Sequence, residues 1–220
     1  QGSVAAIGNG NQIMNIIILV LSSMTVATTV LISRYFGAGD PEKAKSVSNA
    51  SIYSLSFFSI VVTLLIYGFQ RPLFQWLQVP NDILDETCSY TVIVSTCILI
   101  QAIYMVFASI LRSHKLMKYV TFVAIIMNTL NILGNAILIN GLFGFPRLGI
   151  IGAAISTNIS KFIGLVIIIL VFLKKTNMGL GFLNLKYFSF KMAKKVLLIA
   201  VPSGGEAFSY QMSQLIILRF

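Results

Sequence analysis

Residues 127–141, MNTLNILGNAILING, form an apolar stretch that asparagines interrupt at positions 128, 131, 135 and 140. On a helix with about 3.6 residues per turn, Asn128, Asn131 and Asn135 fall at i, i+3 and i+7, so their carboxamides share one stripe. A single asparagine between membrane helices usually hydrogen-bonds a neighbouring helix. Three on one stripe favour a polar cavity, in which amide oxygens accept water or a cation.

A second polar stretch, LSSMTVATTVLIS at residues 21–33, spreads Ser and Thr over much of one predicted helix. Its default interpretation is close packing, because Ser and Thr satisfy their hydroxyls on carbonyls of their own helix. GIIGAAISTNISK, residues 149–161, also contains small residues, for which close packing is again the default interpretation, and Thr157 and Asn158 follow them. Lys161 stands near the middle of that predicted span, where an ammonium facing lipid is costly, so it must snorkel or enter a cavity.

The composition of the 220-residue chain indicates that its solvent is lipid, because 57% of the residues are hydrophobic, 10% are charged and the mean hydropathy is +0.89. Soluble domains carry roughly 25% charged residues. The net charge of +10 does not indicate nucleic-acid binding, since the basic residues are divided among short gaps between apolar runs. The two cysteines and the single histidine form no metal or disulfide pattern.

The apolar runs predict an all-α fold, a polytopic transmembrane helix bundle. Five runs are long enough to cross a hydrocarbon core of about 30 Å, and a sixth begins near Lys194. The five predicted spans are residues 11–33, 46–69, 87–110, 119–140 and 149–173. Because the chain opens without a methionine and stops inside an apolar run, we expect it to be a fragment of a longer polypeptide.

Lys and Arg are distributed unevenly between alternate connections, which predicts how the chain crosses the membrane. One set of connections holds only Arg71 and Arg147. The other set holds Arg34, Lys43, Lys45, Arg112, Lys115, Lys118, Lys174, Lys175, Lys186, Lys191, Lys194 and Lys195. Because basic loops resist translocation, the second set is predicted to face the cytoplasm, and residues 1–10 the outside. We expect an integral membrane protein of a bacterial inner membrane.

Four motifs, in this order, resemble the multidrug and toxic compound extrusion (MATE) family of transporters. LISRYFGAGDPEKA, residues 31–44, resembles the first cytoplasmic loop of that family, and SILRSHKLMKY, residues 109–119, resembles the second. LNILGNAILINGLFGFPRLGIIGAAISTNIS, residues 130–160, resembles the fifth and sixth helices with their outer hairpin. AVPSGGEAFSYQMSQLIILRF, residues 200–220, resembles the start of the seventh helix.

The resemblance implies twelve helices in two six-helix lobes, with a central cavity that opens to either side alternately. This chain would cover helices two to six and part of seven, so it would be an incomplete first lobe. The expected domains are residues 1–173, the first-lobe helices; residues 174–195, a cytoplasmic basic linker along the anionic inner leaflet; and residues 196–220, the truncated start of the second lobe. The first helix and most of the second lobe would belong to the remainder of the same polypeptide.

The resemblance also implies a cation site in the first lobe, built around an acid on the missing first helix. The positions carried over to this chain are Asn131, Asn135 and Thr157. Some relatives have an acid where this chain has Asn135, and an amide cannot take up and release a proton near neutral pH. Proton coupling through that position is therefore disfavoured, whereas the carbonyl oxygens of Asn131 and Asn135 can help to coordinate sodium.

In the seventh helix, several relatives carry a glutamate where this chain has Tyr210, and the acid here is Glu206, one turn earlier. One interpretation is that Glu206 is a helix-start charge near the cytoplasmic surface, with Pro202 marking the first turn. The other is that Glu206 faces the cavity and binds a cation or substrate. Lys161 would then be its partner, or would occupy the cation site itself when the site is empty. Both interpretations stay open.

These features predict a secondary active antiporter that exports organic, often cationic, compounds in exchange for Na⁺ or H⁺. A lipid-linked saccharide flippase of the same superfamily is the alternative, although it would need more basic residues in the cavity than Lys161. An enzyme is disfavoured, because no nucleophile with a base and no pair of metal ligands shares a span. The expected partners are a small organic substrate, membrane lipid and the rest of the polypeptide, with no nucleic acid and no cofactor apart from the coupling ion.

Overall fold

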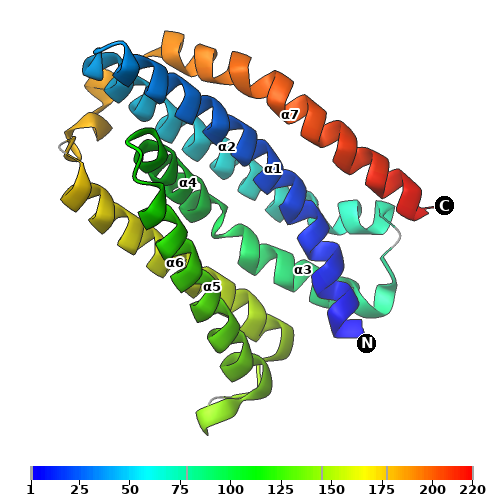
Figure 1. The fold of residues 1–220 in the computed structure, drawn as a ribbon. Coiled ribbons are helices and arrows are strands. Elements are labelled where there is room, and N and C mark those ends of the chain that lie inside the picture. The colour runs from blue at the N-terminus through cyan, green and yellow to red at the C-terminus, as the bar shows by residue number, and fades with distance from the viewer. Residues whose placement is uncertain (1, 78, 145, 177, 220) are drawn as a thin grey trace. The chain divides into compact units, whose positions relative to one another are not determined.

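The computed structural model describes residues 2–77, 79–144, 146–176 and 178–219, with the side chains at positions 2–7, 9–10, 12, 143, 206–208, 211–212 and 214–219 outside that description. Within these residues the chain is helical (Figure 1). The α-helices are α1 (Gly2–Gly37), α2 (Pro41–Trp76), α3 (Asn81–Ser95), α4 (Ile98–Ser113), α5 (Met117–Asn140), α6 (Gly149–Lys175) and α7 (Phe190–Arg219). Three short 3-10 helices are η1 (Leu142–Gly144), η2 (Gly181–Leu183) and η3 (Leu185–Tyr187).

The predicted fold class, an all-α bundle of membrane-spanning helices, is confirmed. Among the described residues, four helices are long and apolar enough to cross a membrane, and the number is five if the bent pair α3 and α4 forms one span. Each predicted span lies within one helix or, for residues 87–110, across that bent pair. The helices extend beyond the apolar runs, because polar residues at the ends continue the same hydrogen-bond pattern.

The turn between α1 and α2 has the sequence signals of one helix ending and another starting. Gly39 adopts a positive φ of 71°, a conformation that costs glycine little. The Asp40 carboxylate then accepts a hydrogen bond of 3.0 Å from the backbone N–H of Lys43, and Pro41 occupies the first helical position. These contacts fix where α2 begins.

The third predicted span is broken, which the sequence did not indicate. α3 ends at Ser95, α4 starts at Ile98, and the two helices are bent by 41° (Figure 1). At the break, the Cys97 N–H donates to the Val94 carbonyl at 3.2 Å, a three-residue bond where a continuous helix would bond to Ile93. The bend therefore leaves the Ile93 carbonyl without its regular helical partner.

The contacts within the chain divide it into two compact units. The first unit consists of Gln1–Met14, Phe58–Gln101 and Thr121–Ile167, and the second of Asn15–Phe57, Ala102–Val120 and Ile168–Phe220. Each unit combines segments far apart in sequence, so it forms only when several helices pack together. The domain boundaries predicted at residues 173 and 195 follow the resemblance to a two-lobed transporter and stay a prediction.

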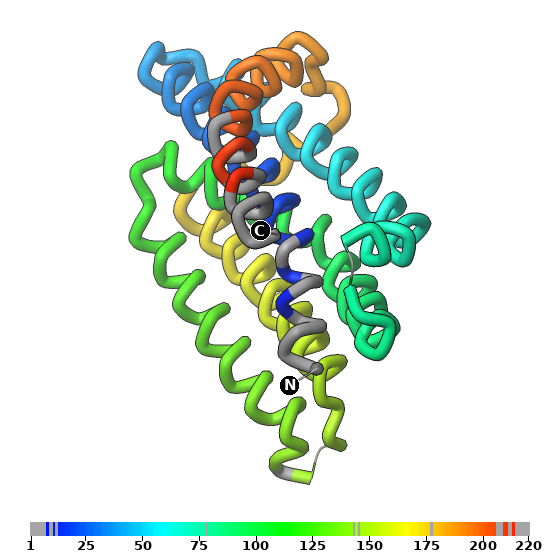
Figure 2. Tube along the Cα trace, turned by 90° about the vertical axis from the view of Figure 1, so that its right-hand side faces the viewer, coloured from blue at the N-terminus to red at the C-terminus, as the bar shows by residue number. Residues whose placement is uncertain are grey.

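In the first unit, an apolar cluster packs the end of α2 against the start of α3. Phe74, Val79, Ile83 and Leu84 are buried there, with Ile13, Cys88 and Ile150 packed against them. In the same unit, α5 and α6 run side by side and antiparallel to each other, and a hairpin joins them (Figure 2). Gly141 starts this hairpin with a φ of 72°, and the Leu148 N–H closes it on the Leu138 carbonyl at 3.0 Å.

The second unit has an aromatic core that includes part of the basic linker. Phe182 of η2 is buried against Phe172 and Phe107, with ring centroids 5.7 and 6.3 Å away. The buried Asn49 of α2 donates to the carbonyls of Phe182 and Asn184, at 2.6 and 3.0 Å. This part of the linker is therefore attached to the helices. Its position along the inner leaflet stays a prediction.

The interpretation of Pro202 as a first-turn residue is wrong. α7 begins at Phe190, before the predicted start near Lys194, and Pro202 lies inside the helix. Lys194 and Lys195 lie within this helix. An acid at position 206 would therefore be well past the first turn of α7, so the helix-start interpretation of Glu206 loses its basis.

Candidate cation site

Two glycines bring α5 and α6 into close contact in the first unit. A Cβ atom on Gly134 would overlap the hydroxyl of Ser156, and one on Gly152 would lie 2.6 Å from the carbonyl oxygen of Leu138. Neither position can hold a larger residue without moving a helix or a side chain. The close-packing interpretation of these small residues is confirmed, and it explains why polar side chains of the two helices meet.

A chain of hydrogen bonds joins the predicted cation-site residues across this contact. Asn135 donates through Nδ2 to Oδ1 of Asn131 at 3.3 Å, and Asn131 donates through Nδ2 to the Thr157 hydroxyl at 3.1 Å. The Thr157 hydroxyl donates to the Ala153 carbonyl at 2.9 Å, and the Ser156 hydroxyl donates to the Asn131 carbonyl at 3.0 Å. The three residues carried over from the family resemblance are thus brought together.

One oxygen of this group has its hydrogen-bonding capacity unused. The Oδ1 atom of Asn135 is buried and has no hydrogen-bond partner among the described residues. A buried carbonyl oxygen without a partner costs free energy, about 1–3 kcal/mol, so such groups call for an explanation. Asn135 Oδ1 belongs to the same hydrogen-bond chain as Asn131 Oδ1 and Thr157 Oγ1. All three are neutral oxygen atoms of the kind that a hard cation prefers.

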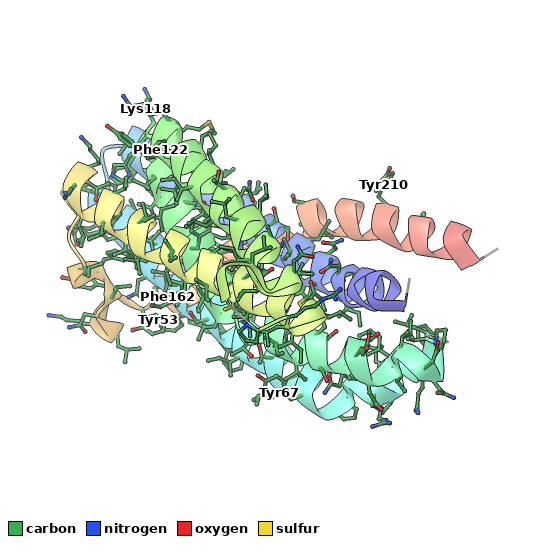
Figure 3. The ribbon with its side chains drawn as sticks, turned by 90° about the horizontal axis from the view of Figure 1, so that it is seen from below. Tyr53, Tyr67, Lys118, Phe122, Phe162 and Tyr210 are labelled. Carbon is green, nitrogen blue, oxygen red and sulfur yellow. The ribbon has the colours of Figure 1, made fainter. Side chains whose placement is uncertain are left out.

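The other predicted site residues do not join this group in the described part of the chain. Asn128 shares the stripe, but its side chain is exposed and lies outside the hydrogen-bond chain. Lys161 is half-buried and forms no ion pair with a described carboxylate. The side chain of Glu206 lies outside the described residues, so its pairing with Lys161 stays a prediction. Tyr210 is 66% exposed and projects away from α7 (Figure 3).

A further polar residue, Asn158, fills the break between α3 and α4. Its Nδ2 donates to the Ile93 carbonyl at 2.7 Å, and its backbone carbonyl accepts from the Cys97 thiol at 3.9 Å. Its Oδ1 atom, like that of Asn135, is buried and without a partner. The sequence shows Asn158 beside Thr157, but nothing in residues 93–97 indicates that a carbonyl there needs a donor.

The hydroxyl stripe of α1 is used for packing within the second unit, as its default interpretation predicted. Thr28 donates to its own helix at the Met24 carbonyl, at 2.8 Å, and shares a hydrogen bond of 2.8 Å with Ser51 of α2. Ser109 of α4 donates to the Thr25 carbonyl at 3.2 Å. These hydroxyls join neighbouring helices, and they are not candidates for the cation site.

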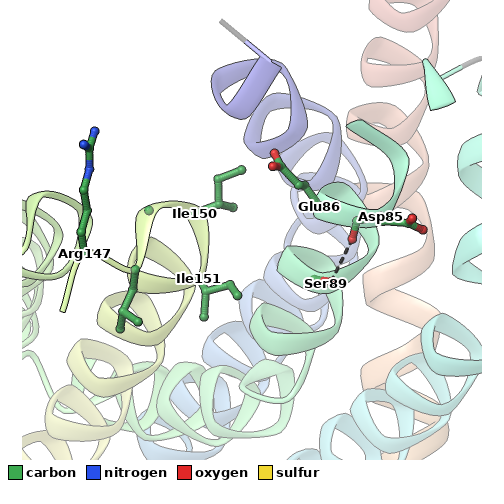
Figure 4. A pocket seen from close by; sticks show the side chains of 8 residues that line it. Asp85, Glu86, Ser89, Arg147, Ile150 and Ile151 are labelled. Carbon is green, nitrogen blue, oxygen red and sulfur yellow. Dashed lines mark hydrogen bonds between the residues drawn. The ribbon is translucent and has the colours of Figure 1, made fainter. Parts of the chain in front are cut away.

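A cavity of about 450 Å³ lies in the first unit beside the start of α3 (Figure 4). Its lining includes the carboxylates Asp85 and Glu86 and the guanidinium of Arg147. Asp85 forms an exposed ion pair with Arg71 at 3.1 Å, which water screens strongly. The residues joined by the hydrogen-bond chain, here called the asparagine group, are Asn131, Asn135, Ser156 and Thr157, and none of them lines this cavity.

The described residues contain no group of three or more His, Cys, Asp and Glu side chains that could hold a metal ion.

The sequence is similar to bacterial transporters over its whole length. A family model described as MatE matches residues 1–137. The chain is 36% identical over 220 residues to the "Uncharacterized transporter YisQ" of Bacillus subtilis, covering all of this chain and 48% of that protein. It is 26% identical over 215 residues to the "Probable multidrug resistance protein NorM" of Thermotoga maritima, covering 94% of this chain and 45% of that protein. The chain thus spans about half the length of the curated relatives it matches.

The fold is also similar to that of solved transporters. One of them, described as the inward-facing conformation of a multidrug resistance MATE family transporter of the MOP superfamily, superimposes with a TM-score of 0.86. The superposition covers 97% of this chain and 48% of that one, at 22% sequence identity. At this identity the likeness concerns the fold, and it agrees with the predicted arrangement of membrane helices.

Proposed function

Because the chain belongs to the MatE family, we propose that the protein of which it forms part is a secondary active antiporter of the membrane. It exports organic, often cationic, compounds by alternating access, in exchange for a cation that moves down its gradient. The chain itself is an integral membrane protein, and its relatives named above are bacterial, which supports a bacterial plasma membrane as its location.

The observation that carries the proposal is the buried Oδ1 atom of Asn135, which has no hydrogen-bond partner among the described residues. A sodium ion moving as the coupling ion would use this oxygen together with Asn131 Oδ1 and Thr157 Oγ1. These are three neutral donors, and a cation bound at membrane depth needs negative charge as well. We expect an acidic residue from another part of the polypeptide to provide that charge.

The chemistry of the amide supports sodium over protons at this position. A carboxamide does not titrate near neutral pH, so Asn135 cannot carry a proton from one side of the membrane to the other. It can exchange water for a sodium ion through its carbonyl oxygen without changing its own charge. The names of the relatives support an export function in general, since NorM of Thermotoga maritima is described as a probable multidrug resistance protein.

A flippase for lipid-linked saccharides is the alternative function, and one observation favours it. Lys161 is half-buried within α6 and has no ion-pair partner among the described carboxylates. An ammonium in that position suits an anionic substrate such as a pyrophosphate. One cation offers little to a doubly charged group, so we rank the flippase below the antiporter.

The experiment is dye efflux by the intact transporter in proteoliposomes, with sodium and proton gradients imposed separately. We expect the sodium gradient to support efflux of ethidium or a similar dye. Asn135→Ala should raise the sodium concentration for half-maximal efflux about tenfold, because the loss of one charge-binding oxygen costs roughly 1.5 kcal/mol. Asn135→Asp should add a dependence on pH that the parent protein lacks.

The matched control is Asn140→Ala, on the same helix. Asn140 is exposed, and its bond among the described residues is to the Ala136 carbonyl of its own helix, at 3.1 Å. This variant should transport like the parent. If Asn135→Ala and Asn140→Ala show the same sodium dependence, Asn135 is not a cation ligand. If neither gradient supports efflux, the antiporter proposal fails and translocation of a lipid-linked saccharide is the next assay.

A further inference from the structure

A cavity of about 330 Å³ lies in the second unit, between the last turns of α1 and the first turns of α7. Its lining residues are of two kinds, and each of the two helices provides both. The basic and aromatic ones are Arg34, Tyr35 and Lys195, and the aliphatic ones are Leu31, Leu198 and Ile199. The cavity is separate from the asparagine group on α5 and α6, which belongs to the first unit.

Two of the lining residues, Arg34 and Lys195, are cations that form no ion pair with a described carboxylate. Lys195 donates to the Tyr35 hydroxyl at 3.1 Å, and its ammonium lies 5.8 Å from the centre of the Tyr35 ring. Arg34 is exposed at the end of α1. Among the described residues, no carboxylate forms an ion pair with either cation. The acids that follow Arg34 in the chain are paired elsewhere, Asp40 with Lys43 and Glu42 with Lys45. Two cations thus face one cavity that suits an anion.

Helix dipoles account for only one of these two cations. A basic residue in the last turn of a helix is stabilised by the C-terminal dipole, which explains Arg34 on α1. Lys195 lies in the second turn of α7, near a helix N-terminus that favours negative charge. The dipole of α7 therefore does not stabilise Lys195, and the contact that holds its ammonium is the one to the Tyr35 hydroxyl.

The aliphatic lining residues indicate what kind of anion the cavity would bind. Leu198 is 62% exposed and Ile199 is 37% exposed. Inorganic phosphate would leave this apolar surface in water. A phospholipid would cover it with an acyl chain while its phosphate meets the cations.

We propose that this cavity binds an anionic phospholipid, with the phosphate between Arg34 and Lys195 and an acyl chain along Leu198 and Ile199. The distribution of Lys and Arg predicts that this end of α1 and α7 faces the cytoplasm, where the membrane leaflet carries anionic lipids. Tyr35 holds the Lys195 ammonium at the edge of the cavity. The lipid would link α1 to α7 at the membrane surface, and its binding does not depend on the cation site proposed above.

The experiment is native mass spectrometry of the purified, intact transporter, titrated with phosphatidylglycerol or phosphatidylcholine. The test variant is Arg34→Gln/Lys195→Gln, and Arg34→Lys/Lys195→Arg keeps both charges. The matched control is Lys191→Gln/Lys194→Gln, which removes two exposed charges from the same helix outside the cavity. Each cation removed from the cavity should lower phosphatidylglycerol affinity about fivefold, which corresponds to roughly 1 kcal/mol. The control and the charge-keeping variant should bind like the parent, and binding of phosphatidylcholine should not change.

Two results would overturn the proposal. The first is an equal loss of phosphatidylglycerol binding in the test and control variants, which would show that general surface charge decides. No loss in either variant would equally overturn it, because Arg34 and Lys195 would then not hold the lipid. The second is displacement of the bound lipid by inorganic phosphate at the same concentration, which would make this a site for free anions. If the double variant does not purify as a single species, Arg34→Gln alone decides, since this side chain is exposed.

Discussion

The substitution Gly152→Ala tests whether close contact between α5 and α6 holds the candidate cation site together. A Cβ atom at this position would lie 2.6 Å from the backbone oxygen of Leu138 and 3.0 Å from its Cβ atom. A backbone oxygen cannot rotate away as a side chain can. The helices must therefore separate by about 0.8 Å to reach an ordinary contact near 3.4 Å.

This separation is large compared with the tolerance of the hydrogen bonds beside it. The bonds from Asn131 to Thr157 and from Ser156 to the Asn131 carbonyl measure 3.1 and 3.0 Å. Lengthened by the same amount, both would exceed the range of a hydrogen bond. Overpacking costs about 1–3 kcal/mol, and each bond lost between membrane helices adds roughly 0.6 kcal/mol. We therefore expect a destabilisation of about 2–4 kcal/mol, together with weaker sodium binding.

The assay is thermal unfolding of the intact transporter in detergent, combined with binding of radioactive sodium. Gly68→Ala is the control, because a Cβ atom on this α2 glycine would meet no atom within 4 Å. Gly152→Ala should lower Tm by several degrees and weaken sodium binding, whereas Gly68→Ala should leave both near the parent values. The reasoning is refuted if Gly152→Ala unfolds and binds sodium like Gly68→Ala.

Two further predictions concern single hydrogen bonds. Asn158→Ala removes the 2.7 Å bond to the Ile93 carbonyl, so amide hydrogen exchange at residues 93–97 should accelerate roughly threefold to thirtyfold, matching about 0.6–2 kcal/mol. The second bond is that of Asp40. Hydrogen bonds from Lys43 hold the pKa of the Asp40 carboxyl in the folded protein below its ordinary value of 3.8. The stabilisation of α2 by the Asp40 carboxylate should therefore be complete above pH 3.8 and be lost as the pH falls through the lowered pKa of the folded protein. Thermal unfolding against pH, compared with Asp40→Asn, measures that loss.

Each of these predictions has its own contradicting result. Unchanged exchange at residues 93–97 in Asn158→Ala would mean that the break between α3 and α4 does not depend on this side chain. Asp40→Asn still caps the helix but does not titrate in this range, so its unfolding should lack the acid step that the parent shows. Identical pH profiles for the two proteins would contradict the assigned role of Asp40.

Much of the fold follows from the sequence because membrane helices are a local consequence of composition. A backbone in hydrocarbon must satisfy its own hydrogen bonds, so every apolar run of sufficient length is expected to be helical. The start of α2 is also encoded locally, since Gly39, Asp40 and Pro41 form the turn and the helix start through contacts with the few residues around them. The same holds for the i and i+4 spacing that puts Asn131 and Asn135 in hydrogen-bond distance.

The tertiary structure decided where a helix breaks and which polar residues work together. The break after α3 depends on a donor from Asn158, 65 positions away from Ile93, and no proline or glycine in residues 93–97 marks it. Asn128 shares the stripe of Asn131 and Asn135 but stays exposed, because α6 brings Thr157 beside Asn131 alone. Spacing along one helix tells which side chains share a face. Only the packing of a second helix decides which of these side chains gain hydrogen-bond partners, and which oxygen, here Asn135 Oδ1, is buried without a partner among the described residues.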